Sequence, residues 1–172
     1  MPSLSDSLVG RTSELSLLDL ALSRLERQGP VALALVGEPG IGKTHLLSEL
    51  CARAERRGYL VLSGSASELE RDLPFWVFVD ALDEYLRGLE PRRLAGLDEA
   101  DRVQLGHVFP SLDADGAGVG AGQRDERFRT HGAVRRLFET LAVTKPFVLV
   151  LDDVHWADAG TIELLGSLMR IP

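Results

Sequence analysis

The chain has 172 residues, of which 45% are hydrophobic and 26% charged, values typical of one globular domain. Its net charge of −7 and its only two lysines, Lys43 and Lys145, exclude a nucleic-acid-binding protein that works through a broad basic surface. The single cysteine, Cys51, excludes an intrachain disulfide framework. No secretory leader or membrane-spanning run is visible, so we expect a cytoplasmic chain with no membrane partner.

The first third of the chain predicts helix, strand, helix and strand in that order. Leucines at helical spacing predict an amphipathic helix from Thr12 to Gln28, which ends at Gly29-Pro30. The apolar run Val31–Val36 is typical of a strand buried on both faces of a parallel sheet. A glycine-rich turn over residues 37–42 and a second helix follow, and Tyr59–Leu62 is the second candidate strand.

The remainder of the chain is predicted to be mostly helical. A third helix rich in aromatic residues is followed by a helix around Asp98–Val108. Residues 111–122 are rich in Gly, Ala and Asp and predict a mobile surface loop. A helix over Arg127–Ala142, a third buried strand at Phe147–Leu151 and a last helix capped by Asp158 complete the order. Strands that alternate with helices predict a layered α/β domain with a parallel sheet.

The segment from Gly37 to Thr44, Gly-Glu-Pro-Gly-Ile-Gly-Lys-Thr, matches the phosphate-binding pattern G-x-x-x-x-G-K-[ST] at every fixed position. Glycines let the backbone turn sharply and direct its N–H groups at phosphate oxygens, and the N-terminus of the following helix adds positive partial charge. Lys43 can reach the β- and γ-phosphates of a nucleotide, and the Thr44 hydroxyl can bind Mg²⁺. The sequence therefore predicts a nucleotide triphosphate site.

Two carboxylates, Asp152 and Asp153, follow the third expected strand. Ligands of open α/β sheets bind beyond the carboxyl ends of the strands, so Asp152 is predicted to hold Mg²⁺, directly or through water. Asp153 is predicted to polarise the attacking water as a general base. Such a pair alone is more often a helix cap or a solvated turn, and its position downstream of a phosphate loop favours the metal role.

These motifs resemble those of a known family. Together with Leu8-Val9-Gly10-Arg11 and the stretch Asp-Asp-Val-His-Trp-Ala-Asp at residues 152–158, they are similar to the signal-transduction ATPases with numerous domains, a branch of the AAA-type P-loop proteins. The similarity is greatest to the N-terminal ATPase module of large ATP-binding LuxR-type transcriptional regulators and of origin-recognition-like AAA proteins. It covers nearly the whole chain and includes Leu73-Pro74-Phe75 and Arg127-Phe128-Arg129.

The resemblance implies ATP and Mg²⁺ as ligands and places Val9, Gly10 and Arg11 near the adenine, although packing of the N-terminal segment explains these three residues equally well. His155 and Trp156 can buttress the acidic motif, or can be a structural histidine and a packing anchor, and Arg129 is expected to be a surface residue. The expected nucleotide-binding residues are Val9, Gly10, Arg11, Gly37, Glu38, Pro39, Gly40, Ile41, Gly42, Lys43, Thr44 and His45, with Thr44 and Asp152 for Mg²⁺ and Lys43 and Asp153 for catalysis.

The resemblance also implies a P-loop NTPase fold of three layers with the strand order 5-1-4-3-2. In that order the strand before the phosphate loop and the strand that ends in Asp152 are not neighbours, and the chain is expected to lack the central and edge strands that would follow them. We expect one partial ATPase domain over residues 1–172, divided into an adenine-side segment with its helix (1–29), the strand, phosphate loop, helix and strand (30–63), a helical segment (64–145) and the acidic motif with the last helix (146–172).

Two functional hypotheses follow from this sequence. The first is an ATP-binding module of a nucleotide-switched signalling or transcription regulator, with at most slow Mg²⁺-dependent ATP hydrolysis and no direct DNA binding by this chain. The second is a catalytically inactive truncated fragment that acts only through association with a longer homologue. The expected partners are ATP and either a second copy of this chain or a longer homologue.

Overall fold

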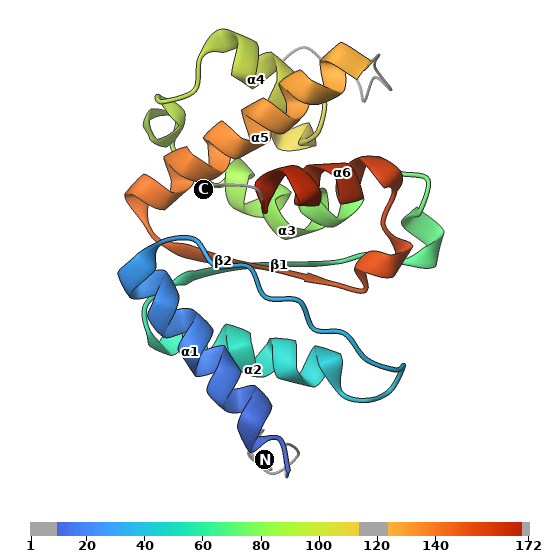
Figure 1. The fold of residues 1–172 in the computed structure, drawn as a ribbon. Coiled ribbons are helices and arrows are strands. Elements are labelled where there is room, and N and C mark those ends of the chain that lie inside the picture. Colours follow the sequence, from blue (N-terminus) through green and yellow to red (C-terminus); the bar gives the residue numbers. More distant parts are fainter. Residues whose placement is uncertain (1–9, 114–123, 170–172) are drawn as a thin grey trace. The chain divides into compact units, whose positions relative to one another are not determined.

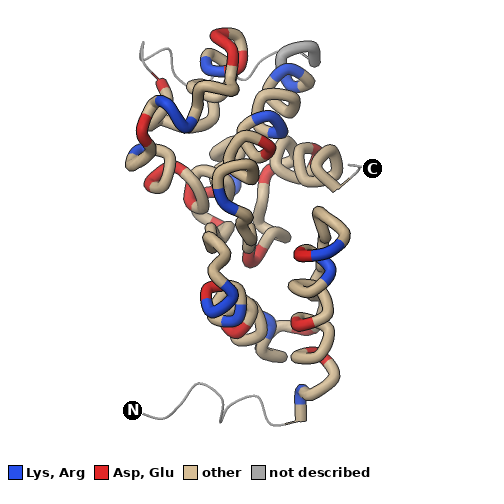
Figure 2. Tube along the Cα trace, turned by 90° about the vertical axis from the view of Figure 1, so that its left-hand side faces the viewer, with Lys and Arg blue, Asp and Glu red and all other residues tan. Residues whose placement is uncertain are grey.

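The computed structural model describes the backbone of residues 10–113 and 124–169, and the side chains of the same residues except 124–126. The chain divides into two compact units, Met1–Tyr59 and Leu60–Pro172. Figure 2 shows acidic and basic residues interspersed along the trace, in keeping with the mixed charge of the sequence. None of the helices in the described ranges is both long enough and apolar enough to cross a membrane.

Two helices form the first unit. They are α1, Thr12–Gln28, and α2, Lys43–Arg56 (Figure 1). Helix α1 has the predicted bounds, buries Leu18 and Leu22 on one face, and ends at Gly29, whose φ of 93° stops the helical repeat.

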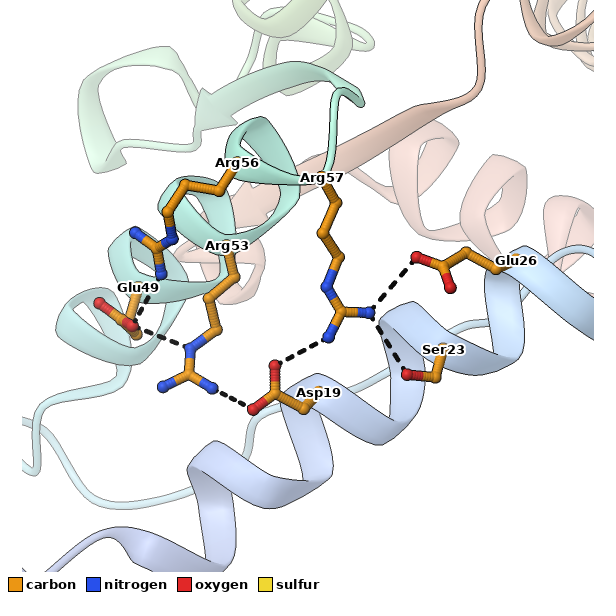
Figure 3. A network of polar contacts seen from close by, with 7 residues as sticks. All are labelled: Asp19, Ser23, Glu26, Glu49, Arg53, Arg56 and Arg57. Carbon is orange, nitrogen blue, oxygen red and sulfur yellow. Dashed lines mark hydrogen bonds and ion pairs between the residues drawn. The ribbon is translucent and has the colours of Figure 1, made fainter.

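Ion pairs join α1 to α2 (Figure 3). Asp19 on α1 accepts hydrogen bonds from Arg53 on α2 and from Arg57, the residue that follows α2, the second at 3.1 Å. Glu49 lies 2.8 Å from Arg53, and Glu26 lies 3.5 Å from Arg57. Because these side chains are partly exposed, each pair contributes no more than about 1 kcal/mol. Two arginines that share one aspartate nevertheless fix the register between the two helices.

The strand expected at Val31–Val36 is not formed, and this prediction is wrong for the structure described here. The segment between α1 and the phosphate loop has no regular secondary structure, and Val36 is 94% exposed. An apolar run becomes a strand only when a neighbouring strand accepts its backbone hydrogen bonds, and neither helix of the first unit can do so.

The second unit contains a two-stranded parallel sheet. Strand β1, Leu60–Ser65, pairs with β2, Phe147–Asp152, from Leu60 opposite Phe147 to Ser65 opposite Asp152. The sequence predicts both strands, although β1 continues past its expected end. Their direct pairing agrees with the strand order that the resemblance implies, and the fold is an incomplete α/β arrangement in which the described sheet has two strands.

Helices connect the two strands and cover one face of their sheet. In Figure 1, α3 and α6 lie over the same face, and α4 packs on α5. The predicted loop at 111–122 falls mostly outside the described residues. The helices are α3, Trp76–Arg87; α4, Glu99–Gly106; α5, Arg124–Thr144; and α6, Ala159–Leu168, with short 3-10 turns at Glu68–Glu70, Pro91–Leu94, Pro110–Leu112 and Val154–Trp156.

A close approach between β1 and α3 organises the core of the second unit. A Cβ atom at Gly64 on β1 would lie 2.8 Å from the backbone nitrogen of Ala81 on α3, and closer still to the Val77 carbonyl oxygen. These are backbone atoms that cannot rotate away, so the contact requires glycine. Behind it lie Phe78 and Leu82, both fully buried.

Candidate nucleotide site

The phosphate loop has the backbone geometry that its sequence predicts. Gly40 and Gly42 have φ values of 76° and 92°, in the left-handed region that favours glycine. Gly42 is also the residue that immediately precedes α2, so the helix begins at Lys43. A Cβ at Gly37 would meet Ile41 Cγ2 at 3.1 Å, which makes the turn tight at its start as well.

Lys43 folds back over the loop. Its Nζ donates hydrogen bonds to the carbonyl oxygens of Gly37, at 3.0 Å, and Glu38, at 3.1 Å. The ammonium group therefore lies against the first residues of the loop, and Lys43 is also the first residue of α2. The first amides of a helix have no acceptor within it, so an ammonium group and a helix N-terminus meet where an anion would be stabilised.

Arg11 contacts the phosphate loop itself. Its guanidinium donates a hydrogen bond to the Ile41 carbonyl oxygen, and its other terminal nitrogen lies 3.4 Å from Glu14. Gly10, which precedes it, has a φ of 88°, whereas Val9 lies outside the described residues. No local pattern in the sequence predicts this contact, and the adenine-side role of the three residues stays a prediction.

The other predicted loop residues lie at the surface of the first unit. Glu38 and Pro39 are exposed, as are Thr44 and His45 in the first turn of α2. The Thr44 carbonyl oxygen accepts a hydrogen bond from the Ser48 hydroxyl at 2.9 Å, which tightens that turn. The structure thus brings Gly37 to His45 together in one loop and helix start.

The acidic motif ends strand β2 in the second unit. Asp152 is its last residue, and the Asp152 carbonyl oxygen accepts a hydrogen bond from the Ala66 N–H at 3.1 Å. Asp153 has a φ of 51°, and its N–H donates to the Asp152 side chain at 2.8 Å. The Asp153 carboxylate lies 3.8 Å from His155 Nδ1, at the surface.

Comparison with known families identifies the class of domain to which both motifs belong. A family model described as "AAA ATPase domain" matches residues 7–172. The chain belongs to this family. An uncharacterized protein of Rhizobium meliloti (strain 1021) is 29% identical over 180 residues, which cover 95% of this chain and 17% of the relative. The chain thus spans less than a fifth of the length of that relative. No solved structure matches the chain significantly.

Within the first unit of this AAA ATPase domain, the phosphate loop has the features that suit a nucleotide phosphate. The left-handed glycines Gly40 and Gly42 open the loop, the Lys43 ammonium lies on it, and the α2 N-terminus follows. Thr44 in this unit carries a hydroxyl and Asp152 in the second unit carries a carboxylate, and each is by itself an oxygen group of the kind that Mg²⁺ prefers.

The aromatic part of the acidic motif belongs to the packing of this AAA ATPase domain. The rings of His155 and Trp156 are 5.0 Å apart, and Trp156 lines a pocket with Trp76 from the start of α3. Trp156 is half-buried, which agrees with its prediction as a packing anchor. Arg129 is exposed on α5, as expected for a surface residue.

One contact of the acidic motif has no signature in the sequence. The sequence predicts that Asp158 caps the last helix, and this is confirmed because the side chain accepts a hydrogen bond from the Thr161 N–H. The same carboxylate also accepts one from the Phe75 N–H at 3.0 Å, from 83 residues earlier in the chain. The cap has a local signature, whereas nothing in the sequence pairs Asp158 with Phe75.

His131 on α5 is a buried base beside this contact. Its ring meets that of Phe75 edge-on, with centroids 6.4 Å apart, and within the described residues its Nε2 has no hydrogen-bond partner. Burial lowers the pKa of His131 below its ordinary value of 6.5, with Glu163 opposing the shift and Arg127 adding to it.

The stability of the second unit should therefore fall as the pH drops. Below pH 6.5 the unfolded chain takes up a proton at His131 more readily than the folded chain does. The contribution of His131 to the unfolding free energy is therefore complete above pH 6.5 and decreases as the pH falls from 6.5 to the lower pKa of the folded state. We expect His131→Gln to reduce the change in unfolding free energy between about pH 7.5 and about pH 5.5 in urea titrations. The exposed control His155→Gln should retain it, and equal pH dependence in wild type and His131→Gln would contradict this.

Proposed function

We propose that this AAA ATPase domain is the ATP-binding module of a nucleotide-switched signalling or transcription regulator, similar to the large ATP-binding LuxR-type regulators. The observation that carries the proposal is the phosphate loop, in which two left-handed glycines, the Lys43 ammonium and the start of α2 converge. A relative in which the matching region is 17% of the protein is in keeping with a module of a large regulator.

In this proposal the phosphate loop binds the nucleotide, and the acidic motif contributes to metal binding and to hydrolysis. The loop amides from Gly37 to Gly42 and the Lys43 ammonium bind the phosphates, and Arg11 steadies the loop through the Ile41 carbonyl. Thr44 and Asp152 hold Mg²⁺, which when bound neutralises charge on the phosphate oxygens. Asp153 orients the attacking water, and hydrolysis is slow because ATP serves as a conformational switch.

Calorimetric titration with ATP, with and without Mg²⁺, tests the metal half of the proposal. We expect Mg²⁺ to strengthen ATP binding, and Asp152→Asn to remove most of that gain, a loss of roughly tenfold in affinity at saturating Mg²⁺. Binding of ATP in EDTA should be the same in both proteins.

A matched control is Asp72→Asn, which neutralises an exposed aspartate outside both motifs. This control should keep the full effect of Mg²⁺. If the dependence on Mg²⁺ is identical in wild type and Asp152→Asn, Asp152 is not a metal ligand.

A further inference from the structure

Asp158 joins two segments that the chain separates by 83 residues. Its Oδ1 accepts hydrogen bonds from the Phe75 N–H, at 3.0 Å, and from the Thr161 hydroxyl. Its Oδ2 accepts one from the Thr161 N–H at 3.1 Å, and Thr161 is fully buried. A carboxylate with both oxygens engaged in this way is held in one orientation.

Phe75 is itself fixed on its other side. Its carbonyl oxygen accepts hydrogen bonds from the Phe78 and Val79 N–H groups in the first turn of α3. A Cβ built at Gly160 would be 3.3 Å from the Phe75 ring, so this ring packs on the first turn of α6. The link between Asp158 and Phe75 therefore ties the start of α6 to the start of α3.

The described part of the chain has two non-glycine residues with positive φ, Phe75 at 59° and Asp153 at 51°. Phe75 is one partner of the hydrogen bond to Asp158, and Asp153 lies in the segment between β2 and Asp158. Asp153 begins that segment directly after β2, and Asp158 ends it, with the turn Val154–Trp156 between them. A bulky residue such as Phe75 stays in the left-handed region only where its surroundings determine its backbone, whereas aspartate adopts that region more readily, so the conformation of Asp153 is sensitive to how its segment is held.

We propose that Asp158 is a positioning residue, which through its hydrogen bond to Phe75 holds the acidic segment closed and Asp153 in its left-handed conformation. With one end fixed by β2 and the other by Asp158, the segment has little freedom to relax. Without the second anchor, Asp153 can return to an ordinary negative φ, which moves its carboxylate. This inference rests on the proposed function where it assigns Asp153 a role toward water.

The test compares two serine substitutions at helix caps. Asp158→Ser keeps an oxygen that can cap Thr161 N–H, because serine is a good N-cap, but its single short side chain cannot also reach Phe75. Asp98→Ser is the matched control, because Asp98 caps α4 by accepting from the Asp101 N–H at 2.8 Å and lies in a different part of the second unit.

The first readout needs no nucleotide. In NMR spectra of the full chain we expect Asp158→Ser to speed hydrogen exchange of the Phe75 amide by at least about tenfold and to shift the Asp153 carbon resonances away from left-handed values. Asp98→Ser should change neither. Unchanged Asp153 resonances in folded Asp158→Ser would overturn the inference. If that variant fails to fold, Asp158→Gly, which also removes the acceptor for Phe75 N–H and costs little as an N-cap, should show the same changes, and unchanged Asp153 resonances in it would overturn the inference as well.

The second readout separates positioning from general damage. We expect Asp158→Ser to lower the turnover of Mg·ATP by about tenfold while its Kd for ATP stays within about twofold of wild type. A wild-type chain that binds no ATP would refute the proposed function, whereas the amide and carbon measurements would still decide whether Asp158 holds Asp153.

Discussion

Replacing Lys43 by alanine should weaken binding of Mg·ATP by about one to two powers of ten. A charge-assisted hydrogen bond to a phosphate contributes about 1.5–3 kcal/mol, which corresponds to that range in Kd. The substitution also removes the two bonds from Nζ to the carbonyl oxygens of Gly37 and Glu38, so the loop loses part of its own support. Isothermal titration calorimetry on folded protein measures the difference directly.

The second lysine of the chain provides a matched control for this measurement. Lys145, the other lysine, is exposed two residues before the start of β2 and lies outside both motifs. Lys145→Ala therefore removes the same charge and the same side chain while the phosphate loop stays intact. We expect it to bind Mg·ATP as the wild type does. Equal affinities for Lys43→Ala and Lys145→Ala would contradict the site and favour an interaction-only fragment.

Gly64→Ala should destabilise the second unit by about 3 kcal/mol, the upper part of the range for overpacked cores. The new methyl group would press on the Val77 carbonyl and on the backbone nitrogen of Ala81, so strand and helix must separate. Fully buried side chains behind the contact, such as Phe78, would then lose part of their packing. Urea denaturation followed by fluorescence of Trp76 and Trp156 reports on this unit.

Gly88→Ala tests whether this cost comes from the close contact. Gly88 ends α3 with a φ of −83°, and its nearest contact for an added Cβ is the Tyr85 carbonyl oxygen at 3.6 Å. We expect its unfolding free energy to stay within about 1 kcal/mol of wild type. A similar small effect at Gly64 would show that β1 and α3 can move apart at little cost.

The sequence predicts the helices and the phosphate loop well because their signals are local. Caps such as Asp158 and helix-ending residues such as Gly29 act within a few positions, and the left-handed turns at Gly40 and Gly42 require glycine where the pattern has it. Strands are different because they exist only through a partner. Residues 31–36 have the composition of a buried strand and remain irregular. Strand β1 extends over Ser63–Ser65, although small and polar residues do not predict a strand there.

The remaining features of the candidate site depend on long-range contacts that no local pattern encodes. The hydrogen bond between Asp158 and Phe75 spans 83 residues, and the bond from Arg11 to the Ile41 carbonyl spans 30. Each donor and acceptor is a common surface group in sequence terms. Only the folded chain shows that Asp158 and Arg11 form hydrogen bonds with backbone atoms next to or within the motifs.

The position of the Lys43 ammonium has a consequence for the thermodynamics of nucleotide capture. The Lys43 side chain is already ordered by its hydrogen bonds to the carbonyl oxygens of Gly37 and Glu38. When a phosphate binds, the ammonium group exchanges these acceptors for phosphate oxygens. Little rotamer entropy remains to be lost at that step, so the association should owe more to enthalpy than it would with a lysine that swings freely in water.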